Sequence, residues 1–104
     1  MHIEKYMFKY IDAINEENFK EAVEILQDSL NFCNDESSFV IKGFIDAAKT
    51  LDALKYGDFD IVEDLWLSYE KSKSKITPKN RYYSIFLEMS LIVEDIKEYY
   101  ERII

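Results

Sequence analysis

The sequence predicts an all-α fold, a five-helix bundle of antiparallel helix pairs that spans residues 1–104 as a single domain. Two stretches that begin forty residues apart, at Asn18 and Asp58, share one pattern: a residue that can start a helix, then an aromatic residue, then apolar residues at helical spacing. With only 2 Gly and 1 Pro, little interrupts long helices. A repeat of about forty residues is typical of stacked helix pairs, each of which buries its apolar face only against a neighbour.

The first two helices are predicted at about residues 3–15 and 18–31, separated by the polar residues Asn15 to Asn18. In both, apolar residues recur at the spacing of one helix face, which should face the core. In the first helix these residues are Ile3, Tyr6, Met7, Tyr10, Ile11 and Ile14, and in the second they are Phe19, Ala22, Val23, Leu26 and Leu30.

The third helix is predicted from Phe39 to Tyr56, after the polar start signal of residues 34–38. Gly43, Ala47 and Ala48 are small at the centre of its apolar face, which would let a neighbouring helix approach closely and would make this the central helix. Gly57 suits a left-handed residue at the helix end. The inward residues should be Val40, Gly43, Phe44, Ala47, Ala48, Leu51 and Leu54.

The last two helices are predicted at about residues 59–72 and from Thr77-Pro78 to the C-terminus, because proline is favoured at the first helical position. The fourth should bury Ile61, Val62, Leu65, Trp66 and Tyr69, and the fifth Tyr83, Phe86, Leu87, Leu91, Ile96, Tyr100 and Ile103. A fifth helix of this length would contact more than one helix or help to form a dimer through whatever apolar surface stays exposed.

Composition and charge exclude several classes of partner. With 48% hydrophobic residues, the 104-residue chain can close a core without disulfides or a metal. Its 21 acidic and 13 basic residues give a net charge of -8, which would repel nucleic acid and anionic membranes, so we expect neither as a partner. The single Cys33 and the absence of a long uncharged apolar run predict a cytoplasmic protein.

Catalytic signatures are missing from the sequence. His2 is the only histidine, which excludes histidine-dependent triads, zinc proteases and di-iron sites. Cys33 has no histidine to activate it as a nucleophile, and two isolated glycines cannot make a phosphate-binding loop. The basic segment Lys71 to Lys75 falls at a predicted helix C-terminus, where the helix dipole favours cations. This structural explanation of the segment competes with a phosphate-binding role. We therefore predict no cofactor, and binding is favoured over catalysis.

Several carboxylates lie within or beside the apolar faces. Glu21 and Glu24 occupy one turn of the second helix, and Asp46 lies between two apolar residues of the third. If Glu24, Asp46 and Glu88 converged in the core, they could raise one another's pKa or bind a metal through oxygen alone. Surface ion pairs of Asp46 with Lys42 or Lys49 are the competing interpretation.

Three segments, Asn18 to Leu26, Lys42 to Ala48 and Tyr56 to Asp58, resemble the small all-helical proteins of domain-of-unknown-function family 309. The resemblance covers roughly residues 15–70, and Glu21, Glu24 and Gly43 are its matching positions. It implies tetratricopeptide-like helix pairs but no reaction. The chain departs from the family at Val23, where the family has histidine, at Lys42 and Asp46, where it usually has glutamine, and at Leu30, where tryptophan is common.

Two functional hypotheses follow. The first is a non-catalytic module that binds a protein or peptide between its helices, or a second copy of itself, with aromatic residues as anchors. The second is a small ligand- or metal-binding protein or enzyme that uses Glu21, Glu24 and Asp46 in a pocket between helices. Beside these carboxylates and Gly43, the candidate binding residues are the aromatic anchors Tyr6, Tyr10, Trp66, Tyr69, Tyr82 and Tyr83.

Overall fold

The computed structural model describes residues 3–33 and 35–104, and within these ranges it contains five α-helices and no strand. The prediction of an all-α fold is confirmed. Two short 3-10 helices, η1 (Leu30–Phe32) and η2 (Phe59–Ile61), extend the end of the second helix and the start of the fourth. The α-helices are α1 (Glu4–Asn15), α2 (Phe19–Ser29), α3 (Ser37–Tyr56), α4 (Val62–Lys73) and α5 (Tyr83–Ile103).

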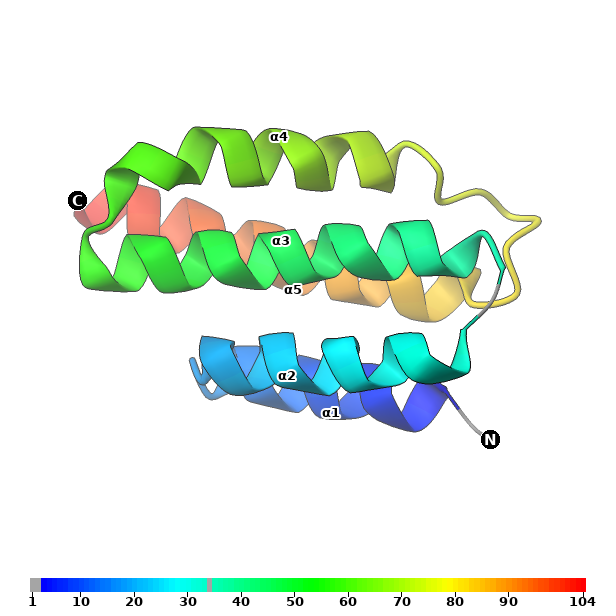
Figure 1. The fold of residues 1–104 in the computed structure, drawn as a ribbon. Helices are drawn as coiled ribbons and strands as arrows, with labels where there is room; N and C mark the ends of the chain where they lie inside the picture. The colour runs from blue at the N-terminus through cyan, green and yellow to red at the C-terminus, as the bar shows by residue number, and fades with distance from the viewer. Residues whose placement is uncertain (1–2, 34) are drawn as a thin grey trace.

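The helices form two layers, with α2, α3 and α4 side by side in one and α1 and α5 behind them (Figure 1). Successive helices run antiparallel. The central helix is α3, as predicted, because it packs against α2, α4 and α5. The last helix also packs against α1, so it folds back behind the front layer and closes the bundle.

The core lies between the two layers and follows the helical spacing of α1, α2 and α3. Two helices approach closely at Gly43 of α3, where a Cβ atom would lie 2.2 Å from the Cβ of Ser72 in α4. A residue larger than glycine at position 43 would therefore force the two helices to shift. The largest fully buried side chains are Tyr10, Tyr69, Phe19, Phe44, Phe86, Met7, Ile14, Leu26, Ile41, Leu51, Met89 and Val40.

The prediction that the fifth helix starts at Thr77-Pro78 is wrong, because α5 begins at Tyr83. Between them, the backbone N–H of Asn80 donates to the carbonyl of Thr77, at 2.9 Å. The Asn80 side chain then accepts a hydrogen bond from the backbone N–H of Tyr82, also at 2.9 Å. This side-chain bond offers the backbone an alternative to the helix, so the turn around Asn80 delays the start of α5.

The predicted inward face of α5 is partly wrong. Phe86 and Tyr100 are buried, but Leu87, Leu91 and Ile103 are exposed, and so is Ile61 before α4. Because α5 carries apolar residues on more than one side, spacing alone left two faces possible. The face that is buried consists of Phe86, Met89, Ser90, Val93 and Tyr100.

The predicted ends of the other helices are close to those observed. Gly57 has the left-handed conformation expected of it, with φ of 78°. Asn18 and Asp58 precede α2 and η2 as predicted, but neither side chain makes a capping hydrogen bond. Of the predicted start signal for α3, Asn34 lies outside the described residues, as does His2.

Candidate binding groove

A groove of about 660 Å³ lies on the front layer, where α2, α3 and the start of α4 meet. We call it the α2–α4 groove. One wall comes from α2, the floor from the second half of α3, and the other wall from the segment that leads into α4. Its lining residues are Lys20, Val23, Glu24, Gln27, Lys49, Asp52, Ala53, Tyr56, Asp58, Ile61 and Leu65.

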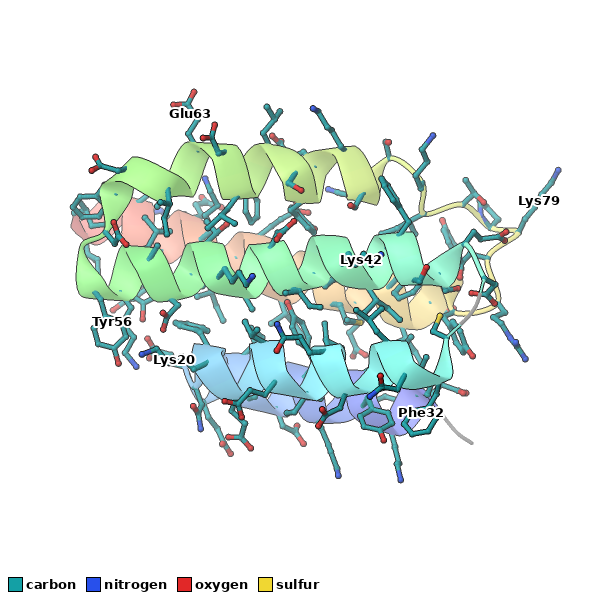
Figure 2. The ribbon with its side chains drawn as sticks, viewed as in Figure 1. Lys20, Phe32, Lys42, Tyr56, Glu63 and Lys79 are labelled. Carbon is teal, nitrogen blue, oxygen red and sulfur yellow. The ribbon has the colours of Figure 1, made fainter. Side chains whose placement is uncertain are left out.

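Apolar side chains from all three helices make up most of the groove surface, and Tyr56 is the most exposed of them. Its side chain is 68% exposed at the last residue of α3, although it is a large aromatic residue. The Nζ atoms of Lys20 and Lys55 lie 5.8 Å and 5.6 Å from the centre of its ring. Figure 2 shows Tyr56 and Lys20 at the same end of the bundle.

The groove also carries charge, three carboxylates against two ammonium groups. The carboxylates belong to Glu24, Asp52 and Asp58, and the ammonium groups to Lys20 and Lys49. None of these carboxylates takes part in an ion pair within the described residues. The ion pairs there join Lys73 to Glu94, Lys97 to Glu101, and Arg102 to Glu98.

The predicted carboxylate site does not assemble. Of its members, only Glu24 lines the α2–α4 groove. Glu21 is exposed and accepts a hydrogen bond from Asn18. Asp46 accepts one from Ser68 at 2.7 Å, which ties α3 to α4. Glu88 lies at a hollow on the opposite layer, and no group of three His, Cys, Asp or Glu within residues 3–33 and 35–104 could hold a metal ion.

Two of the predicted aromatic anchors are core residues. Tyr10 is fully buried and donates to the carbonyl of Phe44 at 2.8 Å, and Tyr69 is 1% exposed. Burial raises the pKa of both phenols well above the usual value, so they resist ionisation even in alkali. Neither is available to a partner. Predicted residue Gly43 is likewise buried, and its role is to let α3 approach α4.

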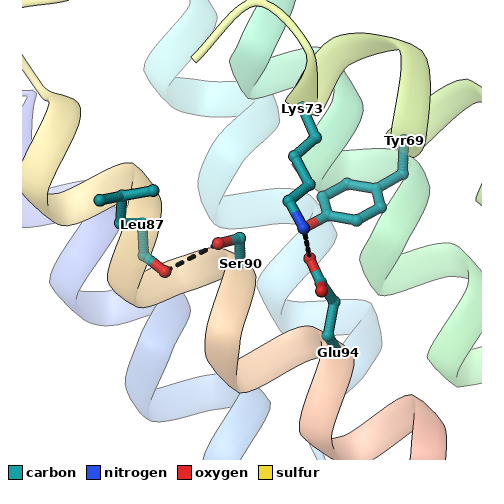
Figure 3. Close-up of polar contacts among 5 residues, drawn as sticks. All are labelled: Tyr69, Lys73, Leu87, Ser90 and Glu94. Atoms are coloured by element: carbon teal, nitrogen blue, oxygen red, sulfur yellow. Dashed lines mark hydrogen bonds and ion pairs between the residues drawn. The ribbon is translucent and has the colours of Figure 1, made fainter. Parts of the chain in front are cut away.

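The hydroxyl of Tyr69 is held by a polar contact between α4 and α5 (Figure 3). It donates to Glu94 at 2.7 Å, and Lys73 forms an ion pair with the same carboxylate at 2.7 Å. In α5, the hydroxyl of Ser90 donates to the carbonyl of Leu87. Because the Lys73–Glu94 pair and the Tyr69–Glu94 hydrogen bond both join α4 to α5, the cluster has a structural role.

The remaining predicted anchors are half-buried: Trp66 packs on Tyr69, with ring centres 4.6 Å apart, and Tyr6 stacks on Phe32. Tyr82 and Tyr83 lie near the start of α5 and are half-buried too. Sequence reasoning missed Tyr56. The signal was a second helical series on α3, beside its core face, made of Lys49, Asp52, Ala53 and Tyr56.

Cys33 does not have the surroundings of a nucleophile. Its thiol is half-buried and donates to a carboxylate oxygen of Asp35 at 3.4 Å. Burial raises the pKa of the thiol, which disfavours the reactive thiolate.

A second apolar surface lies on the back layer, where α1 meets α5. Phe8, Leu87 and Leu91 are 52%, 37% and 66% exposed and line one shallow hollow, so together they form an apolar patch. We call it the α1–α5 patch. It is the exposed remainder of the α5 apolar face that the sequence analysis singled out.

Comparisons with protein-family models, curated proteins and solved structures found no match to this chain. The resemblance to domain-of-unknown-function family 309 therefore stays a prediction from the residues. No helix within residues 3–33 and 35–104 combines the length and the apolar character needed to cross a membrane.

Proposed function

We propose that this chain is a helical binding module that holds a peptide segment of a partner protein in the α2–α4 groove. The observation that carries the proposal is an open, mostly apolar groove with a large aromatic side chain, Tyr56, left exposed in it. Tyrosine is among the residues that contribute most to binding, because a rigid ring buries a large area at little entropic cost. A volume of about 660 Å³ is within the usual range of ligand-binding clefts.

The proposal includes the tetratricopeptide-like character that the sequence suggested. Antiparallel helix pairs in such arrays present a groove on one layer of helices. In this chain, the groove lies on the layer of α2, α3 and α4, while α1 and α5 support it from behind.

A pair of tyrosine variants tests the proposal. Peptides would be selected from a displayed random library on the wild-type protein, and their dissociation constants would be measured with Tyr56→Ala and Tyr99→Ala. Tyr99 is a matched control, because it is 54% exposed on α5 and does not line the groove. We expect Tyr56→Ala to weaken binding about tenfold or more and Tyr99→Ala to leave it unchanged. Equal losses, or no selected peptide, would refute the groove as the binding site.

The alternative of a ligand or metal site built from Glu21, Glu24 and Asp46 has no geometric support. The three side chains have separate surroundings, and Asp46 is already bonded to Ser68.

Self-association is a second candidate function, and the α1–α5 patch favours it. Singly exposed apolar residues need no explanation, but three from two adjacent helices form a contiguous surface. Leu91→Glu places a charge at the centre of the patch on a side chain that is 66% exposed, so the fold should tolerate it. If the patch is a dimer interface, sedimentation will show a dimer for the wild type and a monomer for this variant. A wild-type monomer at high concentration would exclude the interface.

A further inference from the structure

We infer that the segment held in the α2–α4 groove is a basic amphipathic helix, whose Lys or Arg residues face Asp52 and Asp58. This inference rests on the proposed function and adds the chemical class of the partner. It follows from the length of the groove, the backbone chemistry of its walls and the charge at one of its ends.

The length of the groove fits two turns of a helix. Its lining runs from Lys20 to Gln27 on α2 and from Lys49 to Tyr56 on α3, seven residue steps on each. At 1.5 Å per residue, the lining on each of these two helices is roughly 10 Å long. Along that distance a bound helix can place three apolar side chains, at i, i+3 or i+4, and i+7. The floor and the two walls of the groove supply apolar residues for these side chains to contact.

The walls of the groove favour a helical over an extended occupant. All of them are helical segments, and residues 3–33 and 35–104 contain no strand whose edge could pair with an extended peptide. An extended backbone in this apolar groove would turn some of its amide groups toward walls that offer no strand edge to pair with. A helix satisfies its own backbone hydrogen bonds and can present a purely apolar side to the groove.

One end of the groove attracts cations. Asp58 lies there, just after the C-terminus of α3, where the helix dipole adds partial negative charge, and Asp52 lies one helical turn before that C-terminus. Lys20 and Lys55 are at this end too, but their ammonium groups lie 5.8 Å and 5.6 Å from the centre of the Tyr56 ring, and that of Lys55 is 3.0 Å from the carbonyl of Glu17. Neither aspartate has an ion-pair partner within the described ranges.

The surrounding sequence reinforces this charge. From Asp58 to Glu70 there are five acidic residues and no Lys or Arg, and the whole chain has a net charge of -8. A basic helix would be attracted from a distance, would approach faster and would then neutralise the two aspartates.

Two synthetic helices with the same apolar face test the inference, one with Lys and the other with Glu at the flanking positions. Their affinities would be measured at low and high salt for the wild type, Asp58→Asn and Glu63→Gln. Asp58→Asn removes a charge but keeps the shape of the residue. Glu63→Gln is the matched control, since its side chain is exposed and points away from α3 (Figure 2).

We expect the Lys helix to bind about tenfold more tightly than the Glu helix at low salt, and this difference to shrink in high salt. Asp58→Asn should weaken binding of the Lys helix about threefold, while Glu63→Gln should leave it within error. Equal binding of both helices would overturn the inference and leave the proposed function in place. Binding of neither helix would also overturn the inference, whereas the proposed function is decided by the peptides selected on the wild-type protein.

The same samples distinguish a second copy of the chain as the occupant. Residues 71–81 contain five basic and no acidic residues, so their charge is complementary to Asp52 and Asp58 of another molecule. Concentration-dependent association of the wild type that Asp58→Asn abolishes would overturn the inference of a helical partner. A wild type that stays monomeric while it binds the Lys helix supports it.

Discussion

At the scale of single residues, Gly43 shows how one small side chain fixes the distance between two helices. An alanine Cβ there would lie 2.2 Å from the Cβ and 2.5 Å from the hydroxyl oxygen of Ser72. The better helix propensity of alanine offsets only about 1 kcal/mol of the resulting strain. We expect Gly43→Ala to lower the free energy of unfolding by about 1–2 kcal/mol in urea denaturation.

The control for this prediction is the same substitution in a Ser72→Gly background. Removal of the Ser72 side chain frees the space, so Gly43→Ala should then cost much less, and the two changes should be non-additive. An equal cost in both backgrounds would contradict the packing role of Gly43.

Because two tyrosines are buried, the folded protein should lose stability at alkaline pH. Burial raises the pKa of Tyr10 and Tyr69, so the folded state keeps them neutral. Below about pH 10 the unfolded chain is neutral at these residues too, and their contribution to stability is fully present. Above that pH the unfolded chain ionises and the folded chain does not, so stability should fall by roughly 1.4 kcal/mol per pH unit for each tyrosine.

Urea denaturation on both sides of about pH 10 checks this dependence. Tyr69→Phe should be less stable than the wild type near neutral pH, because Glu94 loses the hydrogen bond from the hydroxyl. The same variant should have a shallower alkaline decline. A decline as steep as that of the wild type would show that Tyr69 is not protected from ionisation.

At the scale of helices, the start of α5 depends on Asn80. Its buried side chain accepts a hydrogen bond from the backbone N–H of Tyr82, just before the helix. We expect Asn80→Ala to cost about 1 kcal/mol, as for loss of a helix cap, and Asn80→Asp to retain most of the stability because it keeps the acceptor oxygen. Thermal or urea unfolding measures both. Equal stability of the wild type and Asn80→Ala would refute this role.

The helices differ in how far the sequence predicts them. In α1, α2 and α3 one apolar face stands out, and the predicted inward residues Met7, Leu26 and Phe44 are indeed buried. In α5 apolar residues occur on more than one side. Whether Leu91 is buried or exposed therefore depends on which side of α5 packs against the other helices, and it is exposed. The proline rule for helix starts failed at Pro78 because a local side-chain bond at Asn80 favoured a turn.

The candidate site was harder to predict than the fold. Glu24 was predicted and lines the α2–α4 groove, whereas Tyr10, Tyr69 and Gly43 are in the core. A sequence pattern shows that a tyrosine recurs at helical spacing, but not whether a neighbouring helix covers it. Tyr56 stays exposed because it ends α3, beyond the part of that helix that its neighbours cover.

At the scale of the whole molecule, the apolar surfaces that the two layers leave uncovered include the α2–α4 groove in front and the α1–α5 patch behind. They differ in chemistry. Three carboxylates that form no ion pair within residues 3–33 and 35–104 border the groove beside two lysines, which suits a charged segment of another protein. The patch is bordered by Ser84 and Glu88 and is shallow, which suits a flat contact between copies. Occupation of one surface therefore does not require the other.

The most direct test of recognition in the α2–α4 groove is a map of backbone amide chemical shifts during titration with a peptide selected on the wild-type protein. The account predicts that the largest changes fall on the groove, at Val23, Ala53, Tyr56 and Leu65, and disappear in Tyr56→Ala. Changes centred on Phe8, Leu87 and Leu91 instead, or spread over the whole bundle, would contradict it.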